Sequence, residues 1–339
     1  MLVSLTVASC TGGGDGPDAA GTAASNPAGV EVLISTADAA IGRIADLIVA
    51  DDGTVYAVDH QAGVVHVLDE SGTRLPPLGR PGQGPGELSQ PVALEVRGDT
   101  VFVVDLGNGR LQGLTATGAH LTTRPLPFSQ ALSIGAGTRF VRPTWGIDTM
   151  LAVIHRSDLS VIAPIGRIVG RPTNLVNPRR MRQQIREGSV PNIFLNTAEA
   201  VIGPDSSTWL HVPARGTVQR FDAEGRELWS VELDEPERER LMAEFVSRNE
   251  TSPSGAFFPL RYVVDVTLVG DDAWLLLGNS VTGQASVRVL SSAGTLGERL
   301  EFPGIVGVDE IAVDPERGWV YFVRPDDAEL IRVRWRPAA

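Results

Sequence analysis

The chain has 339 residues, of which 42% are hydrophobic and 21% are charged, as is typical of a globular protein that buries a core. All 29 basic residues are arginine, which excludes a P-loop lysine, a Schiff-base lysine and a Ser-Lys dyad. The net charge of −12 argues against nucleic-acid binding, because that affinity comes mainly from neutralising phosphates. A single cysteine excludes an internal disulfide and a zinc site built from cysteines.

The first residues of the chain combine a short apolar run with a polar tract. Residues 1–9 are mostly apolar, Cys10 follows, and residues 11–29 are rich in Gly, Ala, Ser and Pro. The VASC sequence that ends at Cys10 resembles the lipobox of bacterial lipoproteins. The resemblance implies a signal-peptide remnant over 1–9, lipidation of Cys10, a flexible tether over 10–29, and a place at the bacterial cell envelope, on its periplasmic or extracellular face. The alternative is a non-functional N-terminus with a chance cysteine.

Short β-rich runs recur through residues 30–339. Each is rich in β-branched and aromatic residues and follows a DG-like or GD-like turn. The runs start at residues 54, 100, 138, 208, 273 and 319, and the shorter spacings lie between 38 and 46 residues. Periods of this length are typical of β-propeller blades, each built from four strands. The longer spacings then require insertions.

The last repeat predicts how the ring closes. It offers strands over 310–314, 319–324 and 329–335 but no outer strand, whereas a strand over 30–36 belongs to no repeat. Pairing that strand with the last repeat removes two exposed sheet edges. The sequence therefore predicts an all-β, six-bladed β-propeller, closed by an N-terminal strand that completes the last blade.

The second repeat and its lead-in carry a family resemblance. Residues 79–92 form a Gly-rich lead-in with a proline before the first strand, and Asp105, Asn108 and Arg110 form an Asp-x-x-Asn-x-Arg pattern. These features resemble an NHL-type propeller repeat, which implies a six-bladed propeller of a kind common among bacterial secreted and lipid-anchored proteins. Such propellers mostly bind proteins, glycans or small ligands. Asp105 and Asn108 are expected to cap the turn between the second and third strands, and Arg110 is expected to pair with Asp105 across it.

Two long insertions are expected on one face of the propeller. Residues 170–193 contain a predicted helix over 178–187, and residues 234–260 contain one from about Pro236 to Arg248. Both insertions connect the outer strand of one blade to the inner strand of the next, as does the Gly-rich lead-in. All three therefore emerge on the same face, which we call the decorated face. We expect the binding surface there, near the central channel.

Candidate ligand-binding residues lie mainly on these insertions. The basic side chains of the first insertion could bind a carboxylate or phosphate through paired contacts, and the aromatic side chains that close the second could contact a sugar or peptide. Alternatively, the two helices pair with each other, the charges are only solvated, and the aromatic residues pack the second helix onto the propeller. The candidates are Arg179, Arg180, Arg182, Arg186, Phe257, Phe258 and Tyr262, together with Asp59 at a turn of the first repeat.

Acidic residues recur in the inner strands. Alignment of the repeats places Asp46, Asp265 and Glu310 at one position near the channel mouth, where another repeat offers Glu199 or Ala200. Three such carboxylates could hold a calcium ion, which prefers oxygen ligands. The arrangement is similar to that of the calcium-dependent lactonase and gluconolactonase propellers. Without a cation, the carboxylates would repel one another and at least one pKa would rise.

The sequence favours a non-enzymatic binding protein that is monomeric, needs no cofactor and recognises a glycan, a peptide or a partner protein. It would contact a membrane only through its lipid anchor. The alternative is a calcium-dependent lactone or ester hydrolase. In that enzyme, a metal on the three acids would polarise a carbonyl or activate water, with His60 as the base. No HExxH or GxSxG motif points to another enzyme class.

Overall fold

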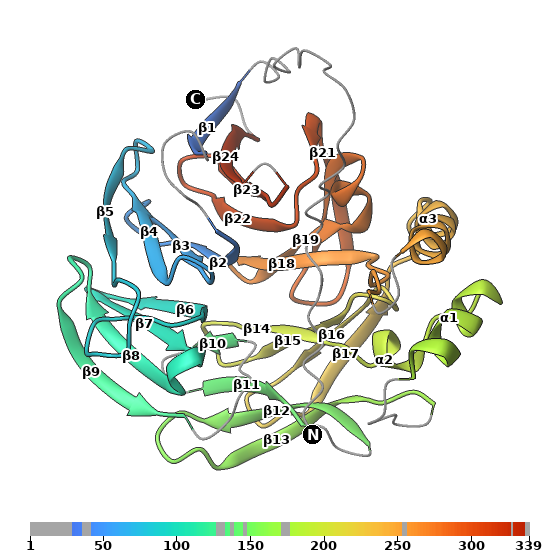
Figure 1. Ribbon diagram of the computed structural model, residues 1–339, viewed down its shortest axis with the longest axis horizontal. Coiled ribbons are helices and arrows are strands. Elements are labelled where there is room, and N and C mark those ends of the chain that lie inside the picture. The colour runs from blue at the N-terminus through green and yellow to red at the C-terminus, as the bar shows by residue number, and fades with distance from the viewer. Residues whose placement is uncertain are drawn as a thin grey trace.

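The computed structural model describes residues 29–35, 42–126, 133–135, 139–144, 148–170, 177–252, 256–326 and 328–335. Within these ranges the chain forms six four-stranded antiparallel sheets arranged around a central axis (Figure 1). The prediction of a six-bladed β-propeller is confirmed. The predicted signal-peptide remnant, the lipidation site Cys10 and almost the whole predicted tether lie outside the described residues.

The blades are numbered along the chain, and each is given from its inner to its outer strand. Blade 1 contains β2 (Ile44–Val49), β3 (Val55–Asp59), β4 (Val64–Leu68) and β5 (Arg74–Leu78). Blade 2 contains β6 (Pro91–Arg97), β7 (Thr100–Asp105), β8 (Arg110–Thr115) and β9 (His120–Pro125). Blade 3 contains β10 (Ser133–Gly135), β11 (Arg139–Pro143), β12 (Thr149–His155) and β13 (Val161–Arg167).

The second half of the ring follows the same order. Blade 4 contains β14 (Glu199–Ile202), β15 (Thr208–Val212), β16 (Thr217–Phe221) and β17 (Glu227–Glu232). Blade 5 contains β18 (Val263–Val269), β19 (Asp272–Leu277), β20 (Gln284–Leu290) and β21 (Leu296–Val306). Blade 6 contains β22 (Glu310–Asp314), β23 (Trp319–Arg324), β24 (Glu329–Arg334) and, as its outer strand, β1 (Val30–Ile34).

The two ends of the ring are joined within blade 6. Strand β1 pairs antiparallel with β24, with Val32 opposite Ile331. Ile34 is fully buried there, and the guanidinium group of Arg332 donates a hydrogen bond of 2.8 Å to the carboxylate of Glu31. The predicted closure is confirmed, and it leaves the last blade with the same number of strands as the others.

The hydrophobic core lies between neighbouring blades. Each of the six interfaces has its own cluster of buried side chains. Between blades 6 and 1, for example, Trp319 and Tyr321 pack against Val55 and Leu68. Successive residues of a strand face opposite sides, so a sheet covered on both faces needs a continuous apolar sequence, and all five residues of β3 are buried. Each fully buried large side chain contributes about 1.5–3 kcal/mol through the hydrophobic effect.

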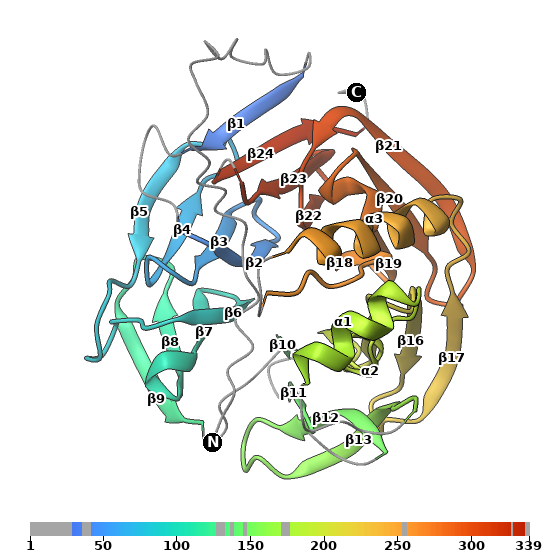
Figure 2. The same ribbon diagram turned by 45° about the vertical axis from the view of Figure 1, so that its right-hand side comes forward.

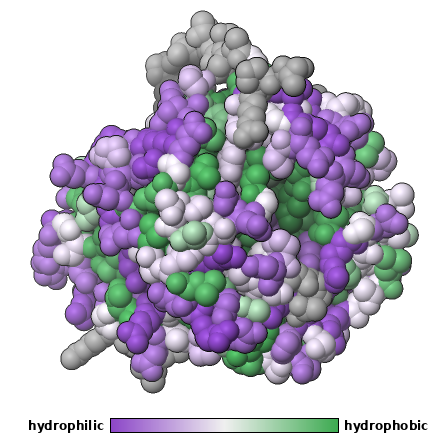
Figure 3. Space-filling view, turned by 180° about the vertical axis from the view of Figure 1, so that it is seen from behind, coloured by the Kyte–Doolittle hydropathy of each residue, from purple (hydrophilic) through white to green (hydrophobic). Residues whose placement is uncertain are grey.

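The outer strands face solvent. Each carries one exposed large hydrophobic residue, so that these side chains are distributed around the ring rather than gathered on one blade. They are Val32, Leu75, Leu121, Val161, Leu228 and Val306. Figure 3 views the molecule from the side opposite to Figure 1, where apolar and polar side chains are interspersed over the surface.

The helical insertions lie on one face, where α1 and α3 pack against each other (Figure 2). The first insertion contains α1 (Pro178–Arg186) and α2 (Asn192–Leu195), and the second contains α3 (Arg238–Thr251). The Asn177 side chain caps α1 by accepting a hydrogen bond from the Arg180 main-chain N–H. The sequence placed the start of the second helix too early, since α3 begins two residues after Pro236, and it missed α2.

Two short 3₁₀ helices, η1 (Leu106–Asn108) and η2 (Gly278–Val281), lie in the turns after the second strands of blades 2 and 5. A membrane-crossing helix would need at least 18 largely apolar residues, and no helix in the described ranges meets that requirement.

Candidate functional site

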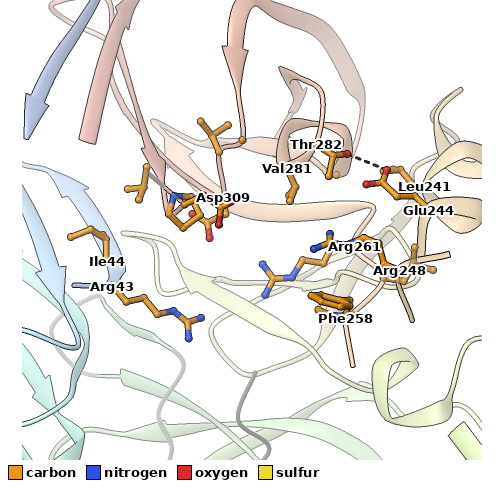
Figure 4. A pocket seen from close by; sticks show the side chains of 18 of the residues that line it. Arg43, Ile44, Leu241, Glu244, Arg248, Phe258, Arg261, Val281, Thr282 and Asp309 are labelled. Carbon is orange, nitrogen blue, oxygen red and sulfur yellow. Dashed lines mark hydrogen bonds between the residues drawn. The ribbon is translucent and has the colours of Figure 1, made fainter. Parts of the chain in front are cut away.

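A pocket of about 370 Å³ opens on the decorated face, where blades 5, 6 and 1 meet α3 (Figure 4). Its walls come from the segments that lead into the inner strands β2, β18 and β22, from the turns after β19 and β23, and from α3. Its volume is within the range of sites for small ligands. The charged and aromatic residues that line it are Arg43, Glu244, Phe245, Arg248, Phe258, Arg261, Asp309 and Asp326.

The N-terminal end of α3 is held by ion pairs. Arg299 contacts Glu235 at 2.9 Å and Glu237 at 2.5 Å, and Arg288 contacts Glu235 at 3.0 Å. Both arginines belong to blade 5, so these pairs tie the helix to the propeller. Burial of the Glu235 side chain, which is only 9% exposed, strengthens these contacts because water screens them less.

The C-terminal end of α3 is held by the side-chain amide of Asn249. Its Nδ2 donates to the carbonyl oxygens of Phe245 and Phe258, and its Oδ1 accepts from the Phe258 N–H. Asn249 is only 2% exposed, so these bonds satisfy a buried polar group. With both ends fixed, the helical wall of the pocket is formed before any ligand binds.

The four predicted arginines of α1 do not meet at this pocket. Arg179, Arg180 and Arg186 are exposed, whereas Arg182 lies 5.0 Å from the centre of the Phe257 ring. Arg182 also donates to the carbonyl oxygens of Asn249 and Ser252, at 3.3 and 3.4 Å. Arg182 therefore joins the two insertions, as the alternative interpretation of paired helices expected.

The three aromatic candidates have different positions. Phe257 and Tyr262 are half-buried and pack into the cluster beneath the insertions, which includes Ile185 and Phe245. The Phe258 side chain lines the pocket instead, with the Arg248 guanidinium group 4.3 Å from the centre of its ring. Phe258 is the one predicted ligand-binding residue that the structure places in the pocket wall.

Asp59 is fully buried and organises a turn of blade 1. Its carboxylate accepts hydrogen bonds from the N–H groups of Gly42, at 2.7 Å, and Ala62, at 2.8 Å, and lies 3.1 Å from His66 Nε2. Burial alone would raise the pKa of Asp59, but the hydrogen bond from His66 and those from the main chain outweigh it and lower that pKa. All of these contacts are internal to the fold.

His60, the candidate base, faces a different cavity. Its Nδ1 lies 3.2 Å from the carbonyl oxygen of Pro91, and the residue lines a cavity of about 280 Å³ beside the Gly-rich lead-in. The three acidic candidates do not line that cavity.

Four acidic residues occupy one register position on the inner strands. Asp46, Asp265 and Glu310 lie opposite Val58, Leu276 and Val323, each one residue before the end of the neighbouring strand. In blade 4 the same position is held by Glu199, which lies opposite His211. The pairing thus selects Glu199 over Ala200. In blade 3 the position falls within residues 127–132, outside the described part of the chain.

Two of these carboxylates connect neighbouring blades. Asp46 Oδ2 accepts a hydrogen bond of 2.8 Å from the Leu94 N–H of blade 2, and Asp265 Oδ2 accepts one of 2.8 Å from the Ile311 N–H of blade 6. Their other oxygens accept from the following residue of their own strand. These two acids therefore serve as links between inner strands.

The acids carry the pKa shifts expected of carboxylates gathered in the interior. Burial, with a smaller contribution from the charge of Asp265, raises the pKa of Asp46 to about 7. Burial and the neighbouring acids raise the pKa of Glu310 well above its usual value. Glu199 differs, because the imidazole of His211, 3.2 Å from its carboxylate, outweighs its burial and lowers its pKa. The sequence predicted such a rise from repulsion between the acids, but burial is its larger cause.

The geometry offers little to a calcium ion. Asp46 and Asp265 already accept two main-chain hydrogen bonds each. Among the residues that the structure describes, no group of three or more His, Cys, Asp or Glu side chains has the spacing to hold a metal ion. Calcium binding at Asp46, Asp265 and Glu310 stays a prediction.

Sequence reasoning missed the charged residues that face the pocket. The guanidinium groups of Arg43 and Arg261 project into the same space, near the carboxylate of Asp309 (Figure 4). Within the described ranges neither arginine makes an ion pair or a side-chain hydrogen bond. A signal was present, because the alignment that found Asp46 and Asp265 also places an arginine three or four residues before each of them.

Comparisons with known proteins find similarity only among solved structures, and that similarity concerns the fold. No known protein-family profile matches the chain, and no curated protein matches it. Among solved structures, the WD40 repeats of RRP9 align over 92% of this chain and 98% of that one, with 12% identity and a TM-score of 0.55. U3-55K aligns over 91% and 99%, with 11% identity and a TM-score of 0.52. A streptogramin B lyase aligns over 85% and 78%, with 14% identity and a TM-score of 0.47. At 11–12% identity, the likeness to the first two structures shows the propeller fold alone.

Proposed function

We propose that this protein is a non-enzymatic binding module of the bacterial cell envelope, and that its ligand site is the pocket on the decorated face. The ligand presents an anionic group to Arg43 and Arg261. The observation that carries the proposal is that two guanidinium groups, from segments 218 residues apart, enter one pocket without an ion-pair partner in the described chain. A guanidinium group matches a carboxylate or phosphate through two parallel hydrogen bonds.

The rest of the pocket supports a binding role. Its α3 wall is fixed at both ends, so little conformational freedom is lost when a ligand enters. Phe258 and the apolar residues beside it supply hydrophobic contact area. A glycan, a peptide or a partner protein with an exposed acidic group would have the required chemistry.

A binding assay on the full chain tests the proposed site. The probes are galacturonic acid trimer and an equimolar tripeptide library, both of which carry carboxylates. We expect at least one probe to bind, and we expect the double variant Arg43→Gln/Arg261→Gln to lose that binding. The matched control is Arg179→Gln/Arg180→Gln, which removes two exposed arginines of α1 and should bind as the wild type does. Unchanged binding in the first variant, or no binding of either probe to the wild type, contradicts the proposal.

The placement at the envelope is supported by the lipobox-like sequence before Cys10 and by the NHL-like pattern in blade 2. Mass spectrometry of the mature N-terminus tests it. A lipid-modified Cys10 is expected in membrane extracts, and an unmodified Cys10 peptide in the same extracts contradicts the anchor.

A calcium titration separates this function from the alternative hydrolase, which depends on Asp46, Asp265 and Glu310. A calcium-dependent rise in melting temperature that disappears in Asp265→Ala would favour the hydrolase. A melting temperature that does not respond to calcium is the result expected of the binding module.

A further inference from the structure

The pocket contains unpaired charges of both signs. Glu244 accepts hydrogen bonds from Arg240 and Thr282, and Arg248 stacks on a ring, so both are engaged. Four other charged residues of the lining make no ion pair or side-chain hydrogen bond within the described chain. Two of them are cations, Arg43 and Arg261, and two are anions, Asp309 and Asp326. The unpaired groups therefore sum to no net charge.

These charges come from three neighbouring blades. Arg43 precedes β2 of blade 1 and Arg261 precedes β18 of blade 5. Blade 6 lies between them and supplies Asp309, just before β22, and Asp326, in the turn after β23. Figure 4 shows Asp309 close to the space that the two guanidinium groups enter. Groups suited to an anion and groups suited to a cation thus line one pocket, whose remaining wall is largely apolar.

This arrangement distinguishes between the ligand classes. An acidic glycan carries only negative charges, so the arginines would attract it while Asp309 and Asp326 repelled it. A neutral glycan would offer no charge to any of these four groups, whose only electrostatic neighbours are then one another. A short peptide with free termini carries a carboxylate, an ammonium group and apolar side chains, and each of these has a counterpart in the pocket.

We infer, on the basis of the proposed binding function, that the ligand is a short peptide with free termini. Its carboxylate binds between Arg43 and Arg261, and its ammonium group binds at Asp309 and Asp326. A zwitterion satisfies both sets of unpaired groups at once, which an anionic ligand cannot do.

Affinity selection with mass spectrometry tests this inference on the full chain. The probes are an equimolar tripeptide library, the same library with acetylated N-termini, the same library with amidated C-termini, and galacturonic acid trimer. We expect the wild type to retain free tripeptides and to bind each capped form of the selected sequence at least tenfold more weakly. Asp309→Asn should abolish the discrimination against acetylation alone, and Arg261→Gln should abolish the discrimination against amidation alone. A variant that loses one discrimination but keeps the other must be folded.

The outcomes separate this inference from the function on which it rests. If galacturonic acid trimer binds and Arg261→Gln removes that binding, while no tripeptide is retained, the binding site stands and the peptide assignment is wrong. Equal binding of acetylated and free peptides also overturns the ammonium site. If every probe binds equally to wild type and to Arg43→Gln/Arg261→Gln, the proposed site itself is wrong.

Discussion

Two groups of charged residues on the decorated face serve different purposes. In blade 2, Asp105 is fully buried and accepts hydrogen bonds from the Ser89 N–H, Asn108, Arg110 and Gln112. At the pocket, Arg261 makes no comparable bond in the described chain. A charge whose hydrogen bonds are all internal holds the fold, whereas a charge left without a partner beside a cavity is available to a ligand.

The largest expected effect is on the Asp105 network. Asp105→Ala leaves the buried donors around it without an acceptor, so the free energy of unfolding should fall by about 3 kcal/mol or more. Urea denaturation measures this loss. The comparison is Asp309→Ala at the pocket, where no hydrogen bond is broken and stability should be equal or higher. Equal losses in both variants would remove the distinction between the two groups.

Loss of the ion pairs that hold the N-terminal end of α3 should have the next largest effect on stability. Arg299→Met removes the contacts with Glu235 and Glu237, which should lower the free energy of unfolding by about 1–2 kcal/mol. It should also speed proteolysis within residues 234–260, because the start of the helix is released. Arg226→Met is the control, since that arginine is exposed and its ion pairs are local. Proteolysis at the wild-type rate in Arg299→Met would show that the helix does not need this anchor.

The arginines of α1 should differ in how much they contribute to stability. Arg182→Ala removes the contacts with Phe257 and with two carbonyl groups, so its expected loss is about 1 kcal/mol. Arg180→Ala removes an exposed side chain and should leave the melting temperature unchanged. Differential scanning calorimetry distinguishes the two, and an equal loss would mean that the whole basic face is structural.

The smallest expected effect is a gain in stability. The folded-state pKa of Glu310 is raised, so its protonated form favours the fold below the ordinary value of 4.5, and this stability is lost as the pH rises through the raised pKa. Glu310→Gln should therefore raise the melting temperature by about 1–3 °C at pH 8 and change nothing at pH 4. A variant that melts lower than wild type at pH 8 would mean that the Glu310 carboxylate has a stabilising partner.

Asp46 should affect stability in the same direction as Glu310, over a defined pH interval. Its pKa rises to about 7 from an ordinary value of 3.8, so the stability of the wild type should decline with increasing pH between these values. The decline should persist, less steeply, in Glu310→Gln.

The sequence predicted the fold well because local patterns carry the necessary information. The apolar runs and the turn signals between them predicted the six blades. The strand that belonged to no repeat, β1, predicted that the ring closes by pairing with β24. The position of the acids also followed from alignment, although Glu199 was resolved from Ala200 only by its pairing with His211.

The pocket lies on the face where the sequence placed the binding surface, but of the predicted ligand-binding residues only Phe258 lines it. Whether an arginine is free depends on partners distant in sequence, and Arg182 is engaged by a carbonyl oxygen 67 residues away. Arg43 makes no such hydrogen bond in the described chain, and its position three residues before Asp46 is the one sequence signal that sets it apart from Arg182. Phe258 was found because aromatic residues at the end of an insertion are conspicuous, whereas Asp309 and Asp326 lie in short connections of ordinary composition.

The pairing of β1 with β24 has a consequence for the order in which the molecule is made. Glu31 and Arg332, which meet across these strands, are separated by 301 residues. At a synthesis rate of about 5–20 residues per second, roughly 15–60 s pass between the emergence of the two partners from the ribosome. Blades 1 to 5 can assemble during that interval, but the seam of the ring cannot. A chaperone that held β1 during translation would therefore protect a strand whose partner, β24, has not yet been synthesised.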